Sequence, residues 1–359
     1  MKYIKHSLFA TVLMLTPVVA SAEDNNMKFI NGDALTLINK TIETPERYTR
    51  IDTVKYTGFT DYQRRYLNLQ SAGLALCFKT DSKNIYVRPS YINNRHGWNQ
   101  TEATTDGFTL YIKKNDNWLY AGSKALSDKD YMTMVSNMAP GEKECLLYLP
   151  NFSVVEKVEI GIDADADIDA IPNPFRHKIV FFGSSFTHGT STSRPGLSYP
   201  MQFERATGLH ICDLGMSGNS KLQQSYAKVL ADTEADAFVF DSFSNPSAEE
   251  IEENFDAFVA TIRAAHPTTP LIFMQTIYRE NRNFNTKEDA IEQAKMDMGE
   301  KVVKKAMEND KNIYWLIPNT GDSHDTSVDG VHPNDYGYML WMESIRQPLL
   351  EIFAKYNIK

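Results

Sequence analysis

The pattern of hydrophobic and polar positions divides the chain into two halves. From about residue 27 to residue 163, short runs rich in β-branched and aromatic residues, such as GLALCFKT and GFTLYIKK, alternate with Asn, Asp, Gly and Lys turns. Runs of this length and spacing predict an antiparallel sandwich or jelly roll. The stretch DADADIDAIPNPFRH (163–177) reads as a linker, because its prolines hold the backbone extended.

After the linker, short apolar strands alternate with helices. KIVFFG, HICDLG, AFVFDSF, PLIFMQTI and NIYWLI are predicted strands. Helices are predicted at 198–208, 220–234, 248–267, 287–308 and 334–356. This alternation predicts a parallel sheet covered on both faces, with its site in the loops beyond the strand carboxyl ends.

The first 22 residues have the features of an export signal. Lys2 and Lys5 precede an apolar stretch from Leu8 to Ala20, and Ala20-Ser21-Ala22 is an A-x-A cleavage site. The apolar stretch is too short to span a bilayer comfortably. We therefore expect a mature chain that is exported, periplasmic or secreted, and not inserted in a membrane.

Size and charge set the number of domains and the class of partner. Removing 22 of 359 residues leaves 337, above the roughly 250–300 at which one core stops growing, so two domains are expected. We predict a β-sandwich accessory domain at 23–170, a linker at 171–177 and an α/β domain at 178–359. The formal net charge of −9 becomes −11 when two lysines leave with the signal. An acidic chain argues against nucleic acid and anionic membrane as partners.

Four strand-end loops carry the residue types of an acyl-transfer site. Ser185 in GSSFTHG (183–189) follows a buried strand and a glycine, as a nucleophile on a tight turn does. Gly218 lets its backbone approach a ligand closely, and Asn245 offers a neutral donor for an oxyanion. Asp329 and His332 are three residues apart, so the carboxylate can fix one ring nitrogen while the other accepts a hydroxyl proton.

Each of these residues also has an ordinary structural explanation. Ser184 and Ser185 suit a helix N-cap, and Gly218 and Asn245 suit turns. Pro333 suits the first turn of the final helix, which would place the imidazole at the entry of that helix. These explanations do not account for the joint occurrence of the set at strand ends.

A metal site is the weaker interpretation of the last loop. Asp329 and His332 could join Asp322, His324 and Asp325, but helical HxxxH spacing and cysteine ligands are absent. We therefore expect no metal and no cofactor. The three cysteines occur one per distant segment, and both a disulfide and free thiols stay open for them: Cys77, Cys145 and Cys212.

The loop motifs resemble the sequence blocks of the SGNH/GDSL hydrolases over residues 179–350. GSSFTHG, LGMSGN, DSFSNPS and DGVHPND are similar to the first, second, third and fifth blocks. The third lacks the usual Gly before Asn245, and the common Gly-Asp-Ser is Gly-Ser-Ser here. SRPGLSYP (193–200) and GFTLY (107–111) resemble a bacterial subgroup with an N-terminal GxDLY-type β domain, although Thr109 replaces the Asp of that motif.

The resemblance implies a flavodoxin-like three-layer α/β/α domain preceded by a jelly-roll-like β-sandwich. It implies Ser185 as nucleophile, His332 as base and Asp329 as its orienter. The Ser185 N–H, Gly218 N–H and Asn245 side chain would form an oxyanion hole. It also implies a carboxylic ester hydrolase that removes O-acyl groups, above all O-acetyl groups, from carbohydrate through an acyl-enzyme, or acts on another small ester.

Three further residues are candidates for substrate contact. Trp98 could offer a sugar-stacking face, although an ordinary core or surface aromatic is the commoner case. His188 could line the pocket, and Arg194 could touch substrate or anchor its loop. Two other functions stay open: a lipase, phospholipase or thioesterase, which would need an apolar groove near Ser185, and a non-catalytic glycan-binding protein.

Overall fold

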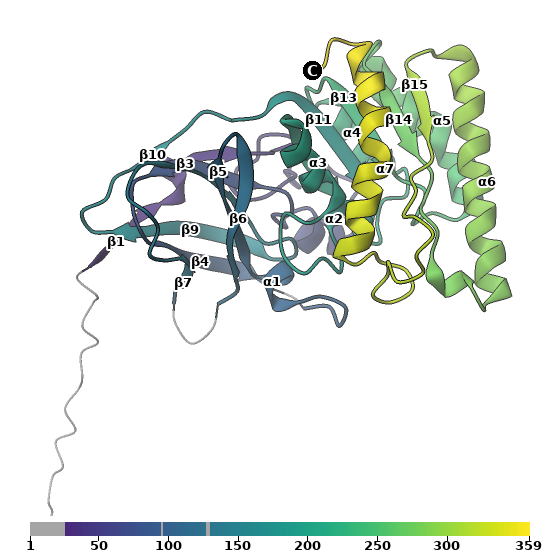
Figure 1. The fold of residues 1–359 in the computed structure, drawn as a ribbon. Coiled ribbons are helices and arrows are strands. Elements are labelled where there is room, and N and C mark those ends of the chain that lie inside the picture. Colours follow the sequence, from purple (N-terminus) through teal and green to yellow (C-terminus); the bar gives the residue numbers. More distant parts are fainter. Residues whose placement is uncertain (1–25, 95, 127–129) are drawn as a thin grey trace, which may run out of the picture.

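Two units lie side by side, a β-sandwich from the first half of the chain and a helix-covered parallel sheet from the second (Figure 1). The structure is a computed structural model that describes residues 26–94, 96–126 and 130–359. The predicted export signal at 1–22 lies outside the described residues. No helix in the described part of the chain has the length and apolarity needed to cross a membrane.

The sandwich consists of two antiparallel sheets. One contains, in spatial order, β1 (Met27–Asn31), β9 (Val154–Asp163), β4 (Ile85–Asn93) and β7 (Met132–Val135). The other contains β10 (Ile168–Ala170), β3 (Ala75–Thr80), β8 (Lys143–Tyr148), β5 (Phe108–Lys114) and β6 (Asn117–Lys124), with β2 (Thr36–Ile38) paired to β3. The predicted β-sandwich is confirmed.

The central strands of the second sheet, β3, β8 and β5, are buried on both faces over most of their length, and the side chains of β3 alternate between two cores. Leu76 and Phe78 pack in the core between the two sheets of the sandwich. Ala75 and Cys77 point the other way, into a core shared with the parallel sheet. A strand buried on both faces reads as a nearly continuous apolar run, as ALCF does here.

The parallel sheet has the order β12-β11-β13-β14-β15. Its strands are β11 (Arg176–Gly183), β12 (Leu209–Gly215), β13 (Ala237–Asp241), β14 (Leu271–Met274) and β15 (Ile313–Leu316). Numbered along the chain, this is the 2-1-3-4-5 order of flavodoxin-like folds, whose ligands bind at the switch point between the first and third strands. The predicted fold class is confirmed.

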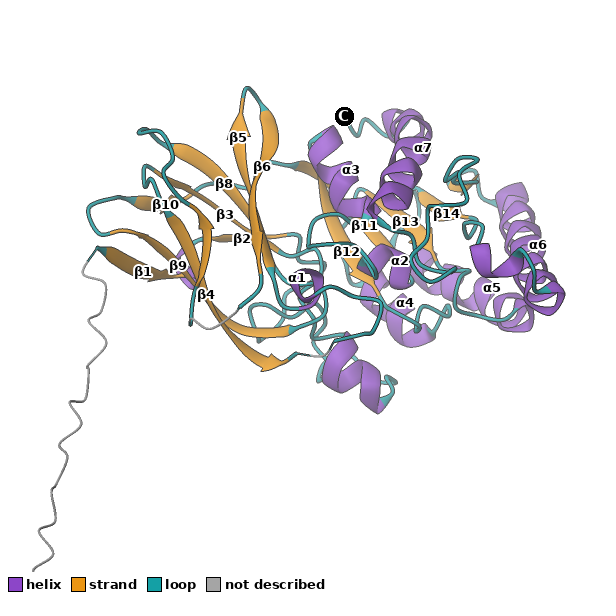
Figure 2. Cartoon of the chain, turned by 60° about the horizontal axis from the view of Figure 1, so that its bottom comes forward, coloured by secondary structure: helices purple, strands orange, loops and turns teal. Residues whose placement is uncertain are grey.

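Helices cover both faces of this sheet (Figures 1 and 2). One face packs against α3 (Tyr199–Thr207) and α7 (Asp335–Ala354), and the other against α4 (Gln224–Ala231), α5 (Ala248–Ala265) and α6 (Thr286–Asn309). In β11, Phe181 faces α3 and α7 whereas Phe182 faces α4 and α5. The short helices are α1 (Glu102–Thr105), α2 (Ser185–His188), η1 (Gly32–Ala34), η2 (Gln63–Leu67) and η3 (Glu280–Arg282).

The two units are joined by buried polar contacts as well as by the shared core. The Glu204 carboxylate of α3 accepts hydrogen bonds from Tyr148 Oη at 2.6 Å and Asn39 Nδ2 at 3.2 Å, both from the first half of the chain. Ile211 N–H donates to its second oxygen at 3.1 Å. These contacts hold the sandwich against the edge of the sheet that carries β12.

The segment from residue 39 to residue 72 leaves the sandwich and crosses to the α4/α5 side of the sheet. Ile51, Tyr56 and Leu67 are buried there among residues of the parallel sheet and of α4 and α5. The fully buried Arg50 donates to the Gly215 carbonyl at 2.9 Å, at the end of β12. The first half of the chain therefore supports the parallel sheet on two sides.

Candidate active site

The turn at residues 183–189, which we call the Ser185 turn, connects β11 to α2. Gly183 ends the strand, and a Cβ there would lie 2.1 Å from Thr187 Oγ1 and 2.8 Å from Asp241 Cβ, so only glycine fits. Ser184 is the N-cap of α2 and accepts a hydrogen bond from Phe186 N–H at 3.1 Å. The two serines therefore differ: Ser184 caps the helix, and Ser185 is its first residue.

A buried carboxylate from the neighbouring strand holds the Ser185 turn. Asp241 Oδ2 at the end of β13 accepts from Ser184 Oγ at 2.7 Å, Ser184 N–H at 3.2 Å and Thr187 Oγ1 at 3.1 Å. Asp241 Oδ1 accepts from Ser244 Oγ at 3.2 Å. Burial raises the pKa of Asp241 although these four donors favour its charged form. Asp241 therefore ties together the loops that follow β11 and β13.

Ser185, His332 and Asp329 form one hydrogen-bonded line. Ser185 Oγ lies 3.0 Å from His332 Nε2, and His332 Nδ1 lies 2.7 Å from Asp329 Oδ2. Ser185 is 5 % exposed, and Asp329 lies deeper than the imidazole, whose side chain is 20 % exposed. The loops that carry these residues follow the carboxyl ends of the parallel strands, at one edge of the sheet. The order of the three groups is that of a nucleophile, a base and an orienting acid.

A tight hairpin presents Asp329 and His332. Ser327 and Pro333 form a β-bridge, and Val328 N–H donates to the His332 carbonyl at 2.9 Å. Within the hairpin, Asp329 Oδ1 accepts from the backbone N–H groups of Val331 at 2.9 Å and His332 at 2.7 Å. The three-residue spacing thus closes an Asx-type turn.

The expectation for Pro333 is corrected by this hairpin. The final helix α7 begins at Asp335 with Asn334 as its N-cap, so Pro333 precedes the helix and belongs to the β-bridge. Asn334 Oδ1 accepts from Gly337 N–H at 2.9 Å. The imidazole therefore projects from the hairpin and not from the first turn of the helix.

Hydrogen bonding determines the charge of Asp329 and the ring nitrogen of His332 that carries a hydrogen. Burial alone would raise the pKa of Asp329, but hydrogen bonds from the His332 backbone and ring, Asn99 and Val331 outweigh it and lower this pKa to about 2. An ionised carboxylate only accepts, so His332 Nδ1 carries a hydrogen. His332 Nε2 then accepts from the Ser185 hydroxyl, the arrangement needed to remove its proton.

Gly218 and Asn245 lie in loops that are linked to the Ser185 turn and to one another. Met216 N–H donates to the Gly183 carbonyl at 2.7 Å, and the following turn has Gly218 at φ +70°. Asn245 Oδ1 accepts from Ser220 N–H at 3.1 Å, which directs its Nδ2 away from that loop. The structure brings both expected donors to the edge of the sheet that carries Ser185.

One of the three candidate substrate contacts is corrected. His188 is fully buried, stacks on Phe152 at 4.3 Å and lies 2.7 Å through Nε2 from the Asn151 carbonyl, so it does not line a pocket. Burial, followed by the charge of Arg50, lowers the pKa of His188 well below its usual value. It fills the contact between the two units.

Arg194 also belongs to the contact between the units. Its Nη1 donates to Tyr111 Oη at 2.8 Å, and its guanidinium lies 4.5 Å from the ring centre of Tyr120 on β6. Arg194 therefore anchors its loop on the sandwich, one of the two roles that the sequence left open.

Trp98 comes from the sandwich and borders the same hollow as Asn99, which contacts Asp329. Its side chain is 85 % exposed and borders a hollow of about 330 Å³. Asn99, Ser191 and Val328 line the same hollow, next to the Ser185–His332–Asp329 line. Of the candidate substrate contacts, Trp98 alone has an exposed face at this edge.

Two of the residues considered for a metal, His324 and Asp329, have other partners. His324 Nδ1 lies 2.9 Å from Glu280 Oε2, and Asp329 is surrounded by donors. No group of three or more His, Cys, Asp or Glu side chains in the described ranges is arranged to hold a metal ion. Cys77, Cys145 and Cys212 are buried free thiols, so no two of them form a disulfide.

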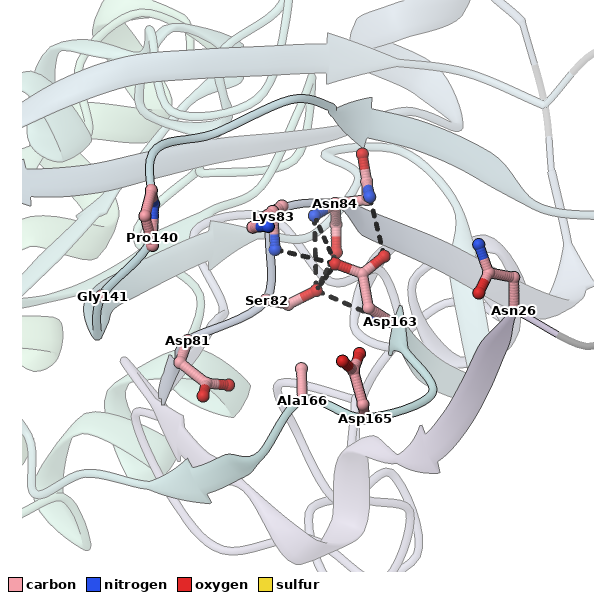
Figure 3. Close-up of a pocket in the computed structure, with 10 residues that line it drawn as sticks. All are labelled: Asn26, Asp81, Ser82, Lys83, Asn84, Pro140, Gly141, Asp163, Asp165 and Ala166. Carbon is pink, nitrogen blue, oxygen red and sulfur yellow. Dashed lines mark hydrogen bonds between the residues drawn. The ribbon is translucent and has the colours of Figure 1, made fainter.

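A second hollow, of about 440 Å³, lies at one end of the sandwich (Figure 3). Two of its three carboxylates, those of Asp81 and Asp163, accept hydrogen bonds within the protein. Asp163 accepts from Ser82 Oγ, from the backbone N–H groups of residues 83 and 84 and from Asn84 Nδ2, and Asp81 accepts from Asp167 N–H. We assign this hollow to the structure of the β-turns and not to the chemistry.

Two residues of the site were missed by sequence reasoning. Asp241 stands at a strand end, a position that could have singled it out, but its partners are set by packing. Asn99 Nδ2 donates to Asp329 Oδ2 at 2.8 Å across 230 positions of sequence, and no local pattern signals that contact.

The fold and this line of side chains define a class, the α/β/α serine hydrolases with a Ser-His-Asp arrangement at the switch point of the sheet. Comparison with known families assigns the chain within that class. The profile described as GDSL-like lipase/acylhydrolase matches residues 176–350, and the profile for the N-terminus of SGNH-type esterases, GxDLY, matches residues 27–168. The chain belongs to this family of SGNH/GDSL ester hydrolases.

Solved structures agree with the assignment. A GDSL-like lipase candidate from Bacteroides ovatus ATCC 8483 is 37% identical, with a TM-score of 0.88, over 92% of this chain and 98% of its own. The salicylyl-acyltransferase SsfX3 of a tetracycline biosynthetic pathway is 19% identical, with a TM-score of 0.69, over 91% of this chain and 97% of its own.

A family two carbohydrate esterase from Clostridium thermocellum is 13% identical, with a TM-score of 0.58, over 80% of this chain and 94% of its own. At these identities, the second and third structures show a shared fold only. Among curated proteins, no sequence matches the chain.

Proposed function

We propose that the protein is a serine esterase that removes O-acyl groups, above all O-acetyl groups, from carbohydrate. The observation that carries the proposal is the line from Ser185 Oγ to His332 Nε2 at 3.0 Å and from His332 Nδ1 to Asp329 Oδ2 at 2.7 Å. A hydroxyl beside an imidazole that a carboxylate orients is an activated nucleophile.

The reaction follows from these distances. Ser185 Oγ attacks the acyl carbon while its proton passes to His332 Nε2, and the carbonyl electron pair moves to the oxygen. Donors from the Ser185 N–H, Gly218 N–H and Asn245 Nδ2 would stabilise that oxyanion, and loss of one such donor costs about 3 kcal/mol. The C–O bond to the alcohol then breaks, and the alkoxide takes the proton from Nε2.

Water completes the cycle on the acyl-enzyme. His332 Nε2 removes a proton from water as its oxygen attacks the acyl carbon, and returns it to Ser185 Oγ when the acid leaves. Asp329 stays ionised throughout, since its pKa is about 2. It stabilises the imidazolium that forms twice in each turnover.

The carbohydrate part of the proposal rests on Trp98. An exposed indole beside a hollow that is also lined by Asn99, a hydrogen-bond partner of Asp329, suits the apolar face of a sugar ring. The fold shared with the carbohydrate esterase from Clostridium thermocellum is consistent with such a substrate but carries no specificity.

A longer acyl chain is the second candidate. Val328 is 49 % exposed on the same hollow as Trp98, so apolar surface is available for a lipase or thioesterase substrate. Rates on C2 and C8 p-nitrophenyl esters distinguish the two: the acetylesterase proposal expects faster hydrolysis of the C2 ester. Acetate release from a panel of acetylated saccharides then identifies the alcohol.

Substitution of Ser185 by alanine tests the chemistry itself. Ser185→Ala is expected to lower kcat on p-nitrophenyl acetate by at least about 10⁴-fold and to abolish labelling by a fluorophosphonate probe. The exposed Ser136, near the end of β7, provides the control Ser136→Ala, which is expected to keep wild-type rates. Full activity of Ser185→Ala would refute Ser185 as the nucleophile. A wild-type protein that neither turns over esters nor reacts with the probe would leave a glycan-binding protein as the better explanation.

A further inference from the structure

Asn99 lies in a turn of the sandwich unit and reaches the other unit. Gln100 N–H donates to the Gly97 carbonyl at 3.1 Å, and Gly97 N–H donates to Gln100 Oε1 at 2.9 Å. The next residue, Thr101, is the N-cap of α1 and accepts from Thr104 N–H at 3.1 Å. The turn is thus defined by its own hydrogen bonds before it meets the hydrolase unit.

The backbone of this turn is attached to the loop that follows α2. Ser191 Oγ donates to the Asn99 carbonyl at 2.9 Å, and Thr101 Oγ1 donates to the Ser193 carbonyl at 2.7 Å. One turn further, Thr104 Oγ1 and Thr192 Oγ1 lie 2.8 Å apart. Contacts on both sides of Asn99 therefore fix where its side chain points.

The side chain points at the buried end of the line. Asn99 Nδ2 lies 2.8 Å from Asp329 Oδ2 and 3.4 Å from His332 Nδ1. The atom that faces an ionised carboxylate must be the amide nitrogen, since a carboxylate only accepts. Asn99 and His332 thus donate to the same oxygen, and the two backbone N–H groups of the hairpin donate to the other.

Asn99 completes the set of donors around Asp329. A carboxylate accepts about four hydrogen bonds, and in the described structure Asp329 receives four. The three others come from the hairpin that holds Asp329 itself. The fourth donor, Asn99, comes from the sandwich unit and opposes rotation of the Asp329 carboxylate toward solvent.

We propose that Asn99 is a positioning residue of the esterase, supplied by the β-sandwich, whose amide holds Asp329 and through it the orientation and charge balance of His332. This inference rests on the proposed function. It gives the sandwich a role in the chemistry, because docking of the 97–101 turn completes the environment of the triad.

The physical effect is electrostatic as well as geometric. The Asn99 amide withdraws negative charge from Asp329 Oδ2 and presents the positive end of an N–H dipole to the imidazole. Both effects oppose a positive charge on His332, the charge that the ring takes up when it accepts a proton. Loss of the amide should therefore favour the protonated ring.

The test is a pair of substitutions in the full-length protein, Asn99→Ala and Asn99→Asp, with Asn117→Ala as control on an exposed position of the same unit. Asn99→Ala is expected to lower kcat/KM on p-nitrophenyl acetate by about 10- to 100-fold at pH 7. The acidic limb of the pH profile of kcat/KM should move upward by roughly half a unit.

Asn99→Asp should move the same limb further, by about one unit or more, since a second carboxylate beside Asp329 stabilises the imidazolium. Its rate should recover in part above that limb. A turn that only docks the two units would lower activity at every pH and leave the limb in place.

Each outcome decides the inference. The inference is overturned if the acidic limb of the pH profile stays in place in both Asn99 variants, or if Asn99→Ala keeps the wild-type kcat/KM. It is supported if the limb moves upward in Asn99→Ala and further upward in Asn99→Asp. Thermal unfolding of each variant separates these effects from loss of fold. Failure of the proposed function is distinguishable, since the wild-type protein would then hydrolyse no ester, or Ser185→Ala would keep full activity, whatever the Asn99 variants do.

Discussion

Asp241 offers the most direct test of how the Ser185 turn is held. It is buried, and its two oxygens receive four donors from the loops after β11 and β13. In Asp241→Ala, the Thr187 hydroxyl can turn to Tyr199 Oη and the Ser244 hydroxyl to Thr276 Oγ1, at 2.8 and 2.7 Å. Two donors of one residue, the Ser184 N–H and hydroxyl, have no such substitute.

The magnitude follows from those two donors. Each buried donor left without a partner costs about 1–3 kcal/mol, so Asp241→Ala should lower the free energy of unfolding by about 2–6 kcal/mol. Asp241→Asn keeps one oxygen for Ser184 and places its amide near the Ser244 hydroxyl, which can accept. We expect Asp241→Asn to lie within about 1 kcal/mol of wild type.

The pH dependence of the asparagine variant sharpens the test. Burial raises the folded pKa of Asp241, so the wild-type protein loses stability as pH rises above the unfolded pKa of this group, while Asp241→Asn does not. The difference in unfolding free energy should therefore shift in favour of the variant as pH rises through that range.

Urea unfolding at several pH values, followed by tryptophan fluorescence, measures both effects, and ester hydrolysis reports on the position of Ser185. Asp241→Ala should lose more activity than its unfolded fraction explains. Equal destabilisation of the alanine and asparagine variants would refute the reasoning, because the carboxylate would then act through its charge and not as an acceptor for Ser184.

Two further predictions concern the contact between the units and the strand end. Burial raises the pKa of Glu204 to about 7 from 4.5, so ionisation of this group should lower the free energy of unfolding by about 3 kcal/mol as the pH rises from 4.5 to 8. Glu204→Gln should flatten the pH dependence of the urea midpoint. Parallel pH curves for the variant and the wild-type protein would contradict this. In Gly183→Ala, the new Cβ overlaps Thr187 Oγ1, which should displace the Ser185 turn and lower kcat by more than about tenfold; unchanged kcat would show that the turn tolerates the overlap.

Much of the fold could be predicted because periodicity reports local burial. In β11, the run IVFF is apolar at every position because both faces of the strand are covered, and the structure divides it between two cores. The positions of Ser185, Gly218 and Asn245 after strands followed from the same pattern. The carboxyl ends of parallel strands share one edge of the sheet. That these residues lie near one another can therefore be predicted without information on side-chain packing.

The amino-acid sequence by itself thus determined the layers, the order of the elements and the edge at which the site lies, since these follow from periodicity and turn chemistry. Tertiary structure alone decided that Asn99 reaches Asp329, that His188 is buried between the units and that Arg194 binds Tyr111. Those partners come from different units, and their meeting depends on how two buried faces dock. No local pattern encodes that docking, because each residue is compatible with its own segment whether or not the partner is present.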